Sequence, residues 1–91
     1  MKHAGQEALE RLSPLLEKLR QRTLLREKRP GIFYLKSRAF LHFHEDPDGL
    51  FADVRLSADF VRLSVTKRAD QAALLRQIDD RLTEFGGSKP G

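Results

Sequence analysis

Two histidines separated by one residue have the clearest capacity for chemistry in this chain. His42 and His44 lie in the run His-Phe-His-Glu-Asp. On a β-strand their imidazoles project from one face, about 6.5–7 Å apart along the chain. Two such imidazoles can share a divalent ion, with Asp53 as a third ligand. The run therefore predicts either a metal site at His42, His44 and Asp53, or two partly exposed sheet histidines with His42 hydrogen-bonded to Asp53.

The same histidine and carboxylate also form half of a hydrolytic triad, because a carboxylate can orient an imidazole. The nucleophile is missing: Ser64 and Tyr34 share the face in some registers, but nothing in the sequence places either hydroxyl on the imidazole. No G-x-S-x-G, P-loop, G-x-G-x-x-G or H-E-x-x-H motif occurs. We therefore expect a protein that is not an enzyme and that uses no cofactor.

A basic run is the second feature with functional potential. It comprises Lys18, Arg20, Arg22, Arg26, Lys28 and Arg29 and contains one acidic residue, Glu27. Such a run can contact nucleic-acid phosphates, with Phe40 and Phe51 stacking on bases. It also fits a solvated helix end, where the helix dipole favours cations. Nucleic-acid binding through residues 18–29 is therefore an alternative function, and Lys18, Arg22, Arg26, Lys28 and Arg29 are its candidate residues.

Composition excludes several classes of protein. The chain has 91 residues, a formal charge of +4 and no cysteine, which rules out disulfides, thiolate metal sites and cysteine nucleophiles. Its length suits a single domain, expected over residues 1–85, with a flexible tail at 86–91. No apolar run resembles a signal peptide or a membrane span, so we expect a cytoplasmic protein without membrane contact.

Leucine spacing predicts a helix near the N-terminus. Leu9, Leu12, Leu16 and Leu19 recur at intervals of three and four. Ser13-Pro14 either splits this segment, with Ser13 as the N-cap of a second helix, or kinks a single helix. The helix ends by Pro30-Gly31, or nearer Arg22 with Leu24–Glu27 extended.

A second helix is expected near the C-terminus. Thr66 can cap it, and its apolar stripe is Leu75, Ile78, Leu82 and Phe85. Between the two helices, four segments rich in aromatic and branched residues predict strands at Gly31–Lys36, Ala39–Glu45, Leu50–Leu56 and Asp59–Val65. The fold class predicted is α+β: a two-layer sandwich in the order α-β-β-β-β-α, with both helices on one face of an antiparallel four-stranded sheet.

Strand alternation assigns residues to the two faces of this sheet. The core face receives Ala39, Leu41 and Phe43, then Leu50, Ala52, Val54 and Leu56, then Val61, Leu63 and Val65. The turn at Asp46–Gly49 sets Glu45 opposite Leu50. This register pairs His42 with Asp53, His44 with Phe51 and Phe40 with Arg55. The first strand contributes either Ile32 and Tyr34 or Phe33 and Leu35 to the open face, and the sequence leaves both registers available.

The open face is the predicted interaction surface. It carries Phe40, His42, His44, Phe51, Asp53 and Arg55, a set richer in aromatic residues than an ordinary solvated sheet face. The first interpretation is self-association as a homodimer, sheet against sheet. The second is a site for a ligand, a partner or an ion. The third is coverage of the aromatic residues by a loop or by the N-terminal piece.

Residues 31–55 carry a resemblance. The stretches Gly31–Tyr34, Phe40–Asp46 and Gly49–Arg55 resemble a set of small bacterial hypothetical proteins, and this resemblance implies no activity. The element order is similar to that of frataxin-type iron-binding domains, whose acidic first helix is replaced here by a basic segment. The resemblance therefore does not extend to their iron function.

Overall fold

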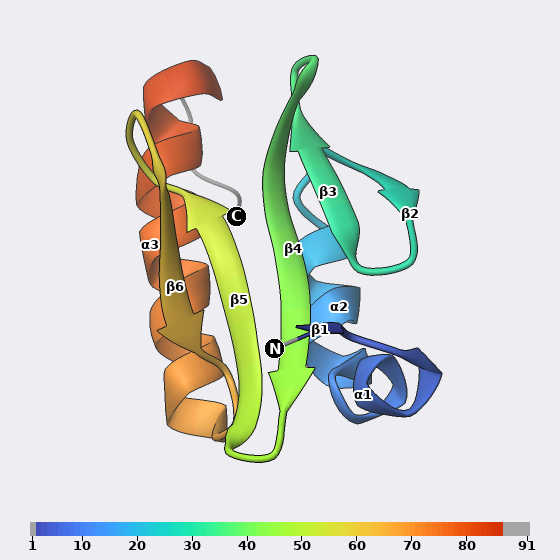
Figure 1. Cartoon of the computed structure of the whole chain (residues 1–91). Helices are drawn as coiled ribbons and strands as arrows, with labels where there is room; N and C mark the ends of the chain where they lie inside the picture. Colours follow the sequence, from blue (N-terminus) through green and yellow to red (C-terminus); the bar gives the residue numbers. More distant parts are fainter. Residues whose placement is uncertain (1, 87–91) are drawn as a thin grey trace.

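The computed structural model describes residues 2–86. The elements, in chain order, are β1 (Lys2–His3), α1 (Gln6–Arg11), α2 (Ser13–Arg20), β2 (Leu25–Arg29), β3 (Ile32–Leu35), β4 (Arg38–Asp46), β5 (Gly49–Arg55), β6 (Phe60–Ser64) and α3 (Arg68–Gly86) (Figure 1). The α+β class and the antiparallel sheet are confirmed, but the number of strands and the order of the elements differ from the prediction. Gly86 ends α3, and the rest of the predicted tail lies outside the described residues.

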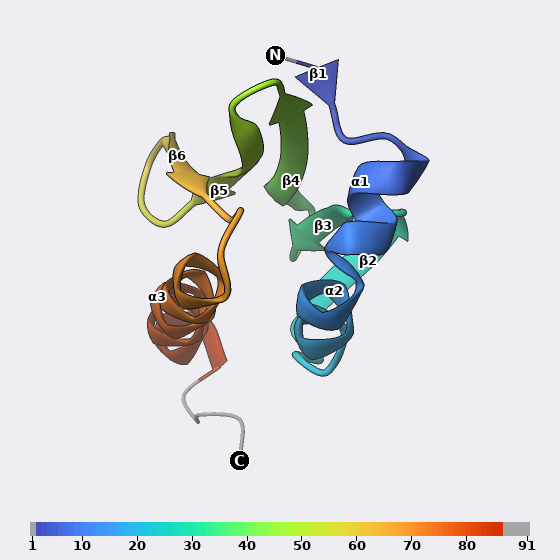
Figure 2. The ribbon, with the colours of Figure 1, turned by 90° about the horizontal axis from the view of Figure 1, so that it is seen from below.

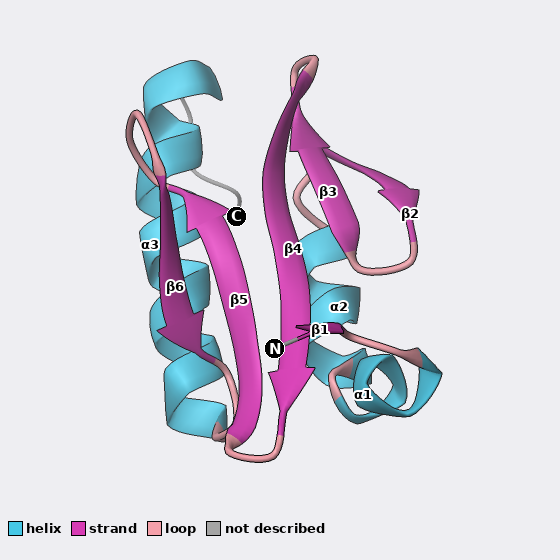
Figure 3. Ribbon diagram, viewed as in Figure 1, coloured by secondary structure: helices cyan, strands magenta, loops and turns pink. Residues whose placement is uncertain are grey.

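The sheet has the order β2-β3-β4-β5-β6, and every pairing in it is antiparallel. The short strand β1 pairs with the C-terminal end of β4. It lies on the same edge of β4 as β3, which pairs with the N-terminal part of that strand. Figure 2 shows α2 and α3 on one side of the curved sheet, as predicted. The opposite face therefore carries none of the helices in residues 2–86, as Figure 3 also shows.

The N-terminal helical segment is split, which confirms one of the two alternatives. Leu12 separates α1 from α2, and Pro14 lies in the first turn of α2, where its missing N–H leaves no helical hydrogen bond unmade. Ser13 is not the N-cap: it is the first residue of α2, and no side chain caps that helix. Because α2 ends at Arg20, the chain is free to form β2 from Leu25, which confirms the shorter helix.

Both long helices bury leucine-rich stripes against the sheet. In α2 the buried residues are Leu15, Leu16 and Leu19, and in α3 they are Leu74, Ile78 and Leu82. Leu75, predicted for the stripe, packs only partly against the core. The side chain of Phe85 lies outside the described part of the chain. Val61, predicted for the core, is 41 % exposed because β6 is an edge strand that the helices cover less completely.

Thr66 does not cap α3. Its hydroxyl accepts a hydrogen bond from the backbone N–H of Leu50 (3.0 Å) and lies 3.2 Å from the carbonyl oxygen of the same residue. The helix begins two residues later, at Arg68. The threonine therefore fastens the end of β6 to the start of β5.

The β4–β5 hairpin has the predicted register. Glu45 pairs with Leu50, His42 with Asp53 and His44 with Phe51. The Asp46 carboxylate accepts a hydrogen bond of 2.8 Å from the backbone N–H of Asp48, which stabilises the turn. This register places the histidines and Asp53 on the face that no helix covers.

A β-bulge at Phe40 breaks the alternation that the prediction assumed. Tyr34 pairs with Ala39 and Phe33 with Leu41, so Phe40 is an extra residue in β4. Its side chain is 2 % exposed and lies in the core beside that of Leu41. Its predicted place on the open face is therefore wrong, and so is its pairing with Arg55, since the β4–β5 ladder ends at Leu41 and Val54.

Burial of an aromatic side chain explains the bulge. Covering a phenylalanine stabilises the fold by about 1.5–3 kcal/mol, whereas a bulge sacrifices little more than one position of the ladder. The structure also decides between the two arrangements left open for the first predicted strand, which is β3. Phe33 and Leu35 are buried, so Ile32 and Tyr34 belong to the opposite face.

Candidate metal centre

All three histidines of the chain meet on the open face of the sheet. His42 and His44 project from β4, and the pairing of β1 with β4 sets His3 opposite His44. One ring nitrogen from each of the three lies within 4.8 Å of the other two. His3 is therefore combined with residues 39 and 41 positions further along the sequence into one imidazole cluster.

Backbone contacts hold β1 in place beside these rings. The N–H of Ala4 donates to the carbonyl oxygen of Phe43 at 3.0 Å, and the N–H of Gly5 donates to the Glu45 carboxylate at 2.6 Å. The ring of His3 consequently stacks on that of His44, with centroids 4.8 Å apart. His3 itself is exposed to solvent.

His44 is the central member of the cluster. Its Nε2 lies 3.0 Å from Nδ1 of His42 and 3.1 Å from Oδ2 of Asp53. A proton on this Nε2 faces two acceptors at once. The other nitrogen, Nδ1, is buried and has no hydrogen-bond partner among residues 2–86. A buried nitrogen without a partner is rare in native structures and calls for an explanation, of which a bound ion or a functional role is one.

Asp53 anchors the cluster from β5. Nε and Nη2 of Arg62 donate to its two carboxylate oxygens at 2.7 and 2.8 Å. The side chains of His44 and Asp53 are only 12 % and 13 % exposed. The predicted hydrogen bond between His42 and Asp53 is not formed, because the carboxylate bonds to Arg62 and His44 instead.

The local charges favour a neutral His42 and an ionised Asp53. Partial burial lowers the pKa of His42 below its ordinary value, and positive charge on His44 adds to this effect. The hydrogen bonds from Arg62 lower the pKa of Asp53, and they raise that of Arg62. Near neutral pH the cluster therefore offers a neutral imidazole, in which one ring nitrogen carries no proton, next to a carboxylate anion.

Phe60 closes one side of the cluster. Phe60 is the first residue of β6, and its ring meets that of His42 edge-on, with centroids 5.2 Å apart. The guanidinium of Arg55 lies 4.3 Å from the centroid of the Phe60 ring. Nε of Arg55 also donates to the carbonyl oxygen of Ala39 at 3.2 Å. Arg55, predicted as part of an interaction surface, is thus engaged in contacts within the chain.

The predicted aromatic contact surface is smaller than expected. Phe40 is buried, and Phe51 is half-buried. Among the described residues, the large hydrophobic side chains that are exposed are Leu24 and Val61, and neither belongs to the predicted surface. The N-terminal strand β1 extends the sheet beside β4, and its His3 ring stacks on His44. Coverage of the aromatic residues by this strand stays a prediction. Self-association through this face stays a prediction.

The basic segment forms several separate ion pairs. Arg20 binds Glu27 and Glu17 at 2.6 and 2.9 Å, and the hydrogen bond from Arg20 lowers the pKa of Glu27. Arg22 donates two hydrogen bonds to Asp79 of α3.

The ammonium of Lys28 lies 4.2 Å from the centre of the Tyr34 ring. Lys18, Arg26 and Arg29 are exposed, and they lie on two different elements. Nucleic-acid binding through residues 18–29 stays a prediction.

Sequence reasoning did not identify His3, Arg62 or Phe60 as residues of this site. His3 belongs to a strand of two residues, which is too short to give a periodic pattern. The open-face position of Arg62 followed from alternation, and its opposition to Asp53 could have indicated the ion pair.

No helix within the described range is long and apolar enough to cross a membrane. No protein-family model matches the chain, no curated protein matches it, and no solved structure matches it. The resemblance to small bacterial proteins stays a prediction, and the case for a function depends on the geometry of the histidine cluster.

Proposed function

We propose that this protein binds a divalent transition-metal ion through His3, His42 and His44. The observation that supports the proposal is the meeting of all three histidines, with ligand nitrogens within 4.8 Å of one another. Imidazole nitrogen is the commonest protein ligand for zinc, copper and nickel. Magnesium and calcium prefer oxygen ligands and are not expected here.

The distances between nitrogens suit a shared ion. Two nitrogens bound to one tetrahedral zinc ion at about 2.0–2.1 Å are about 3.3 Å apart. Nδ1 of His42 and Nε2 of His44 are 3.0 Å apart, close to this separation, so an ion would displace the proton that they share and lie to one side of the line joining them. His3 is the exposed member, and its ring nitrogen lies within 4.8 Å of the ligand nitrogens of the other two histidines.

The charges around the cluster support the same conclusion. A metal ion competes with protons for imidazole nitrogen, so the lowered pKa of His42 favours metal binding at neutral pH. Oδ2 of Asp53 lies 3.1 Å from the same Nε2, where its negative charge stabilises a cation. Arg62 fixes that carboxylate in position.

Such an ion connects a short N-terminal strand to the sheet. The strand β1 has two residues and, among the strands of the described chain, pairs with β4 alone. Metal binding therefore stabilises the attachment of β1, and this structural role needs no reaction at the ion. The expectation that the protein is not an enzyme stays a prediction.

The test is a titration of metal-free protein with zinc, nickel or cobalt, followed by imidazole ¹H–¹⁵N correlation spectra. The chain has three histidines, so every ring signal reports on the site. We expect all three rings to shift at one equivalent of metal. His42→Ala and His44→Ala should each weaken binding at least tenfold, the lower end of the loss usual for a disturbed metal site.

Asp48→Asn is the matched control, because it removes an exposed carboxylate from the neighbouring turn without touching the cluster. It should bind metal as the wild type does. Unmoved imidazole signals at millimolar zinc and nickel would refute the proposal. Equal weakening by Asp48→Asn would also refute it, since the metal would then bind surface carboxylates.

A further inference from the structure

A second site lies where the sheet opens, away from the histidine cluster. The β4–β5 ladder ends at Leu41 and Val54, beyond which β4 pairs with β3 and β5 pairs with β6. The two strands diverge above this point (Figure 1). A pocket of about 110 Å³ occupies the opening, between β4, β5 and α3.

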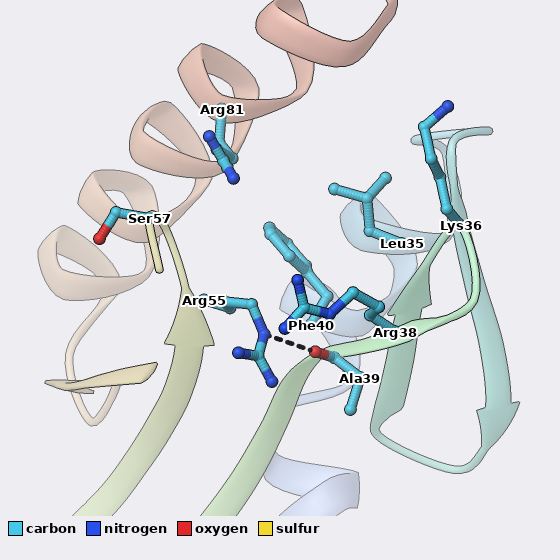
Figure 4. Close-up of a pocket in the computed structure, with 8 residues that line it drawn as sticks. All are labelled: Leu35, Lys36, Arg38, Ala39, Phe40, Arg55, Ser57 and Arg81. Carbon is cyan, nitrogen blue, oxygen red and sulfur yellow. Dashed lines mark hydrogen bonds between the residues drawn. The ribbon is translucent and has the colours of Figure 1, made fainter. Parts of the chain in front are cut away.

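The floor of this pocket is apolar. Phe40, displaced into the core by the bulge, and Leu35 line it, and they are only 2 % and 6 % exposed. In Figure 4 the Phe40 ring and the Leu35 side chain point into the same space. An engineered cavity of about 150 Å³ lined by such residues binds benzene. This pocket therefore suits one compact apolar group whose remainder reaches solvent.

Cations dominate the rim. The charged residues that line the pocket are Lys36, Arg38, Arg55 and Arg81, and none of the lining residues is acidic. Figure 4 shows Arg38 from β4 and Arg81 from α3 extending toward the space around Phe40 from different sides. Lys36 points away from that space, and Arg55 turns to the Ala39 carbonyl oxygen.

The two arginines that face the pocket differ in their present contacts. Nη1 of Arg81 binds Glu84 at 2.6 Å, a partner that is 63 % exposed. The guanidinium of Arg38 makes no hydrogen bond or ion pair with any residue between 2 and 86. Two guanidinium groups beside an apolar floor form a site for an anionic head group attached to an apolar body.

We propose that this pocket binds a small organic anion, in which a compact apolar group packs on Phe40 and Leu35 and a carboxylate or phosphate is held by Arg38 and Arg81. This inference is independent of the metal site, because the two sites share no residue.

The test is an NMR titration of the full chain with benzoate and with phenyl phosphate, read from the backbone amides of Leu35, Ala39 and Phe40. A ligand of this size should bind with a dissociation constant near the millimolar range, about what its few atoms allow. Benzamide, the neutral counterpart of benzoate, should bind at least about tenfold more weakly. Whichever anion binds more tightly identifies the preferred head group.

The variants Arg38→Gln and Arg81→Gln should each weaken binding about tenfold or more. Arg76→Gln is the matched control, because Arg76 is an exposed arginine of α3 that does not line the pocket. It changes the net charge equally and should leave binding unchanged. Arg38 is exposed and unpaired within the described chain, so its loss should not disturb folding.

Three results would overturn the proposal. Benzamide could bind as tightly as benzoate, which would remove the role of the charge. Inorganic phosphate alone could shift the same amides with equal affinity, which would remove the role of the apolar floor. The Arg76→Gln variant could lose as much affinity as Arg38→Gln, which would reduce the effect to net charge.

Discussion

Replacing Phe40 by alanine tests the bulge in β4 directly. Regular alternation places Phe40 and Phe51 on the same open face, so both alanine variants would then lose little and similar stability. The bulge instead buries Phe40 to 2 % exposure and leaves Phe51 half-buried. The two substitutions should therefore differ strongly, and the difference measures the departure from alternation.

The magnitude follows from burial. Truncating a fully buried phenylalanine to alanine costs about 3–5 kcal/mol, whereas we expect about 1–2 kcal/mol for half-buried Phe51. A chain of 91 residues has a free energy of unfolding of about 5–14 kcal/mol. Loss of the Phe40 ring therefore removes a large fraction of the stability and should lower the urea midpoint by about 2–3 M.

The assay is urea unfolding of the wild type, Phe40→Ala and Phe51→Ala, followed by circular dichroism at 222 nm. Phe40→Leu is a milder variant that keeps most of the apolar volume and provides a measurement if Phe40→Ala does not fold. A loss below about 1 kcal/mol for Phe40→Ala, or equal losses for both alanine variants, would refute the bulge and its placement of Phe40.

Three further predictions concern other parts of the fold. Gly31→Ala should lower the free energy of unfolding by about 1–2 kcal/mol, because Gly31 has φ +76° and an added Cβ would lie 2.7 Å from Leu9. Urea unfolding measures this change, and an unchanged stability would contradict the prediction. A double-mutant cycle on Arg22 and Asp79 should give a coupling of about 1 kcal/mol, and additive losses would show that the pair contributes nothing.

The third prediction is a dependence on pH. In chelated, metal-free protein, stability should fall as pH drops below the ordinary histidine pKa of 6.5, because the lowered pKa of His42 lets the unfolded chain bind more protons. His42→Gln should flatten this slope, and an unchanged slope would contradict the assignment.

Local patterns in the sequence predicted much of the sheet. The Asp46–Gly49 turn fixed the β4–β5 register, so the pairings of His42 with Asp53 and of His44 with Phe51 were correct. The spacing of apolar residues also placed α2 and α3. These features depend on neighbouring residues, and such short-range patterns are readable from sequence.

The features that the sequence did not reveal depend on the balance between side-chain burial, strand pairing and side-chain contacts. Burial of Phe40 outweighed regular pairing, and no turn residue marks the bulge. His3 joined the site through a strand of two residues, whose pairing is fixed by contacts with β4 and not by its own sequence. The Asp53 carboxylate, which Arg62 holds in place, lies against His44 and makes no hydrogen bond with His42. Strand register alone does not determine such a side-chain arrangement.

The β1–β4 pairing also has a consequence for the order of folding. Gly5 and Glu45, joined by a hydrogen bond, are 40 residues apart, whereas the β4–β5–β6 meander closes through short loops. Long loops lose more entropy on closure, so the meander should form early and β1 should dock last. The amide of Ala4 should then be among the first to exchange with solvent deuterium, and an imidazole cluster completed only in the final step would report that folding has finished.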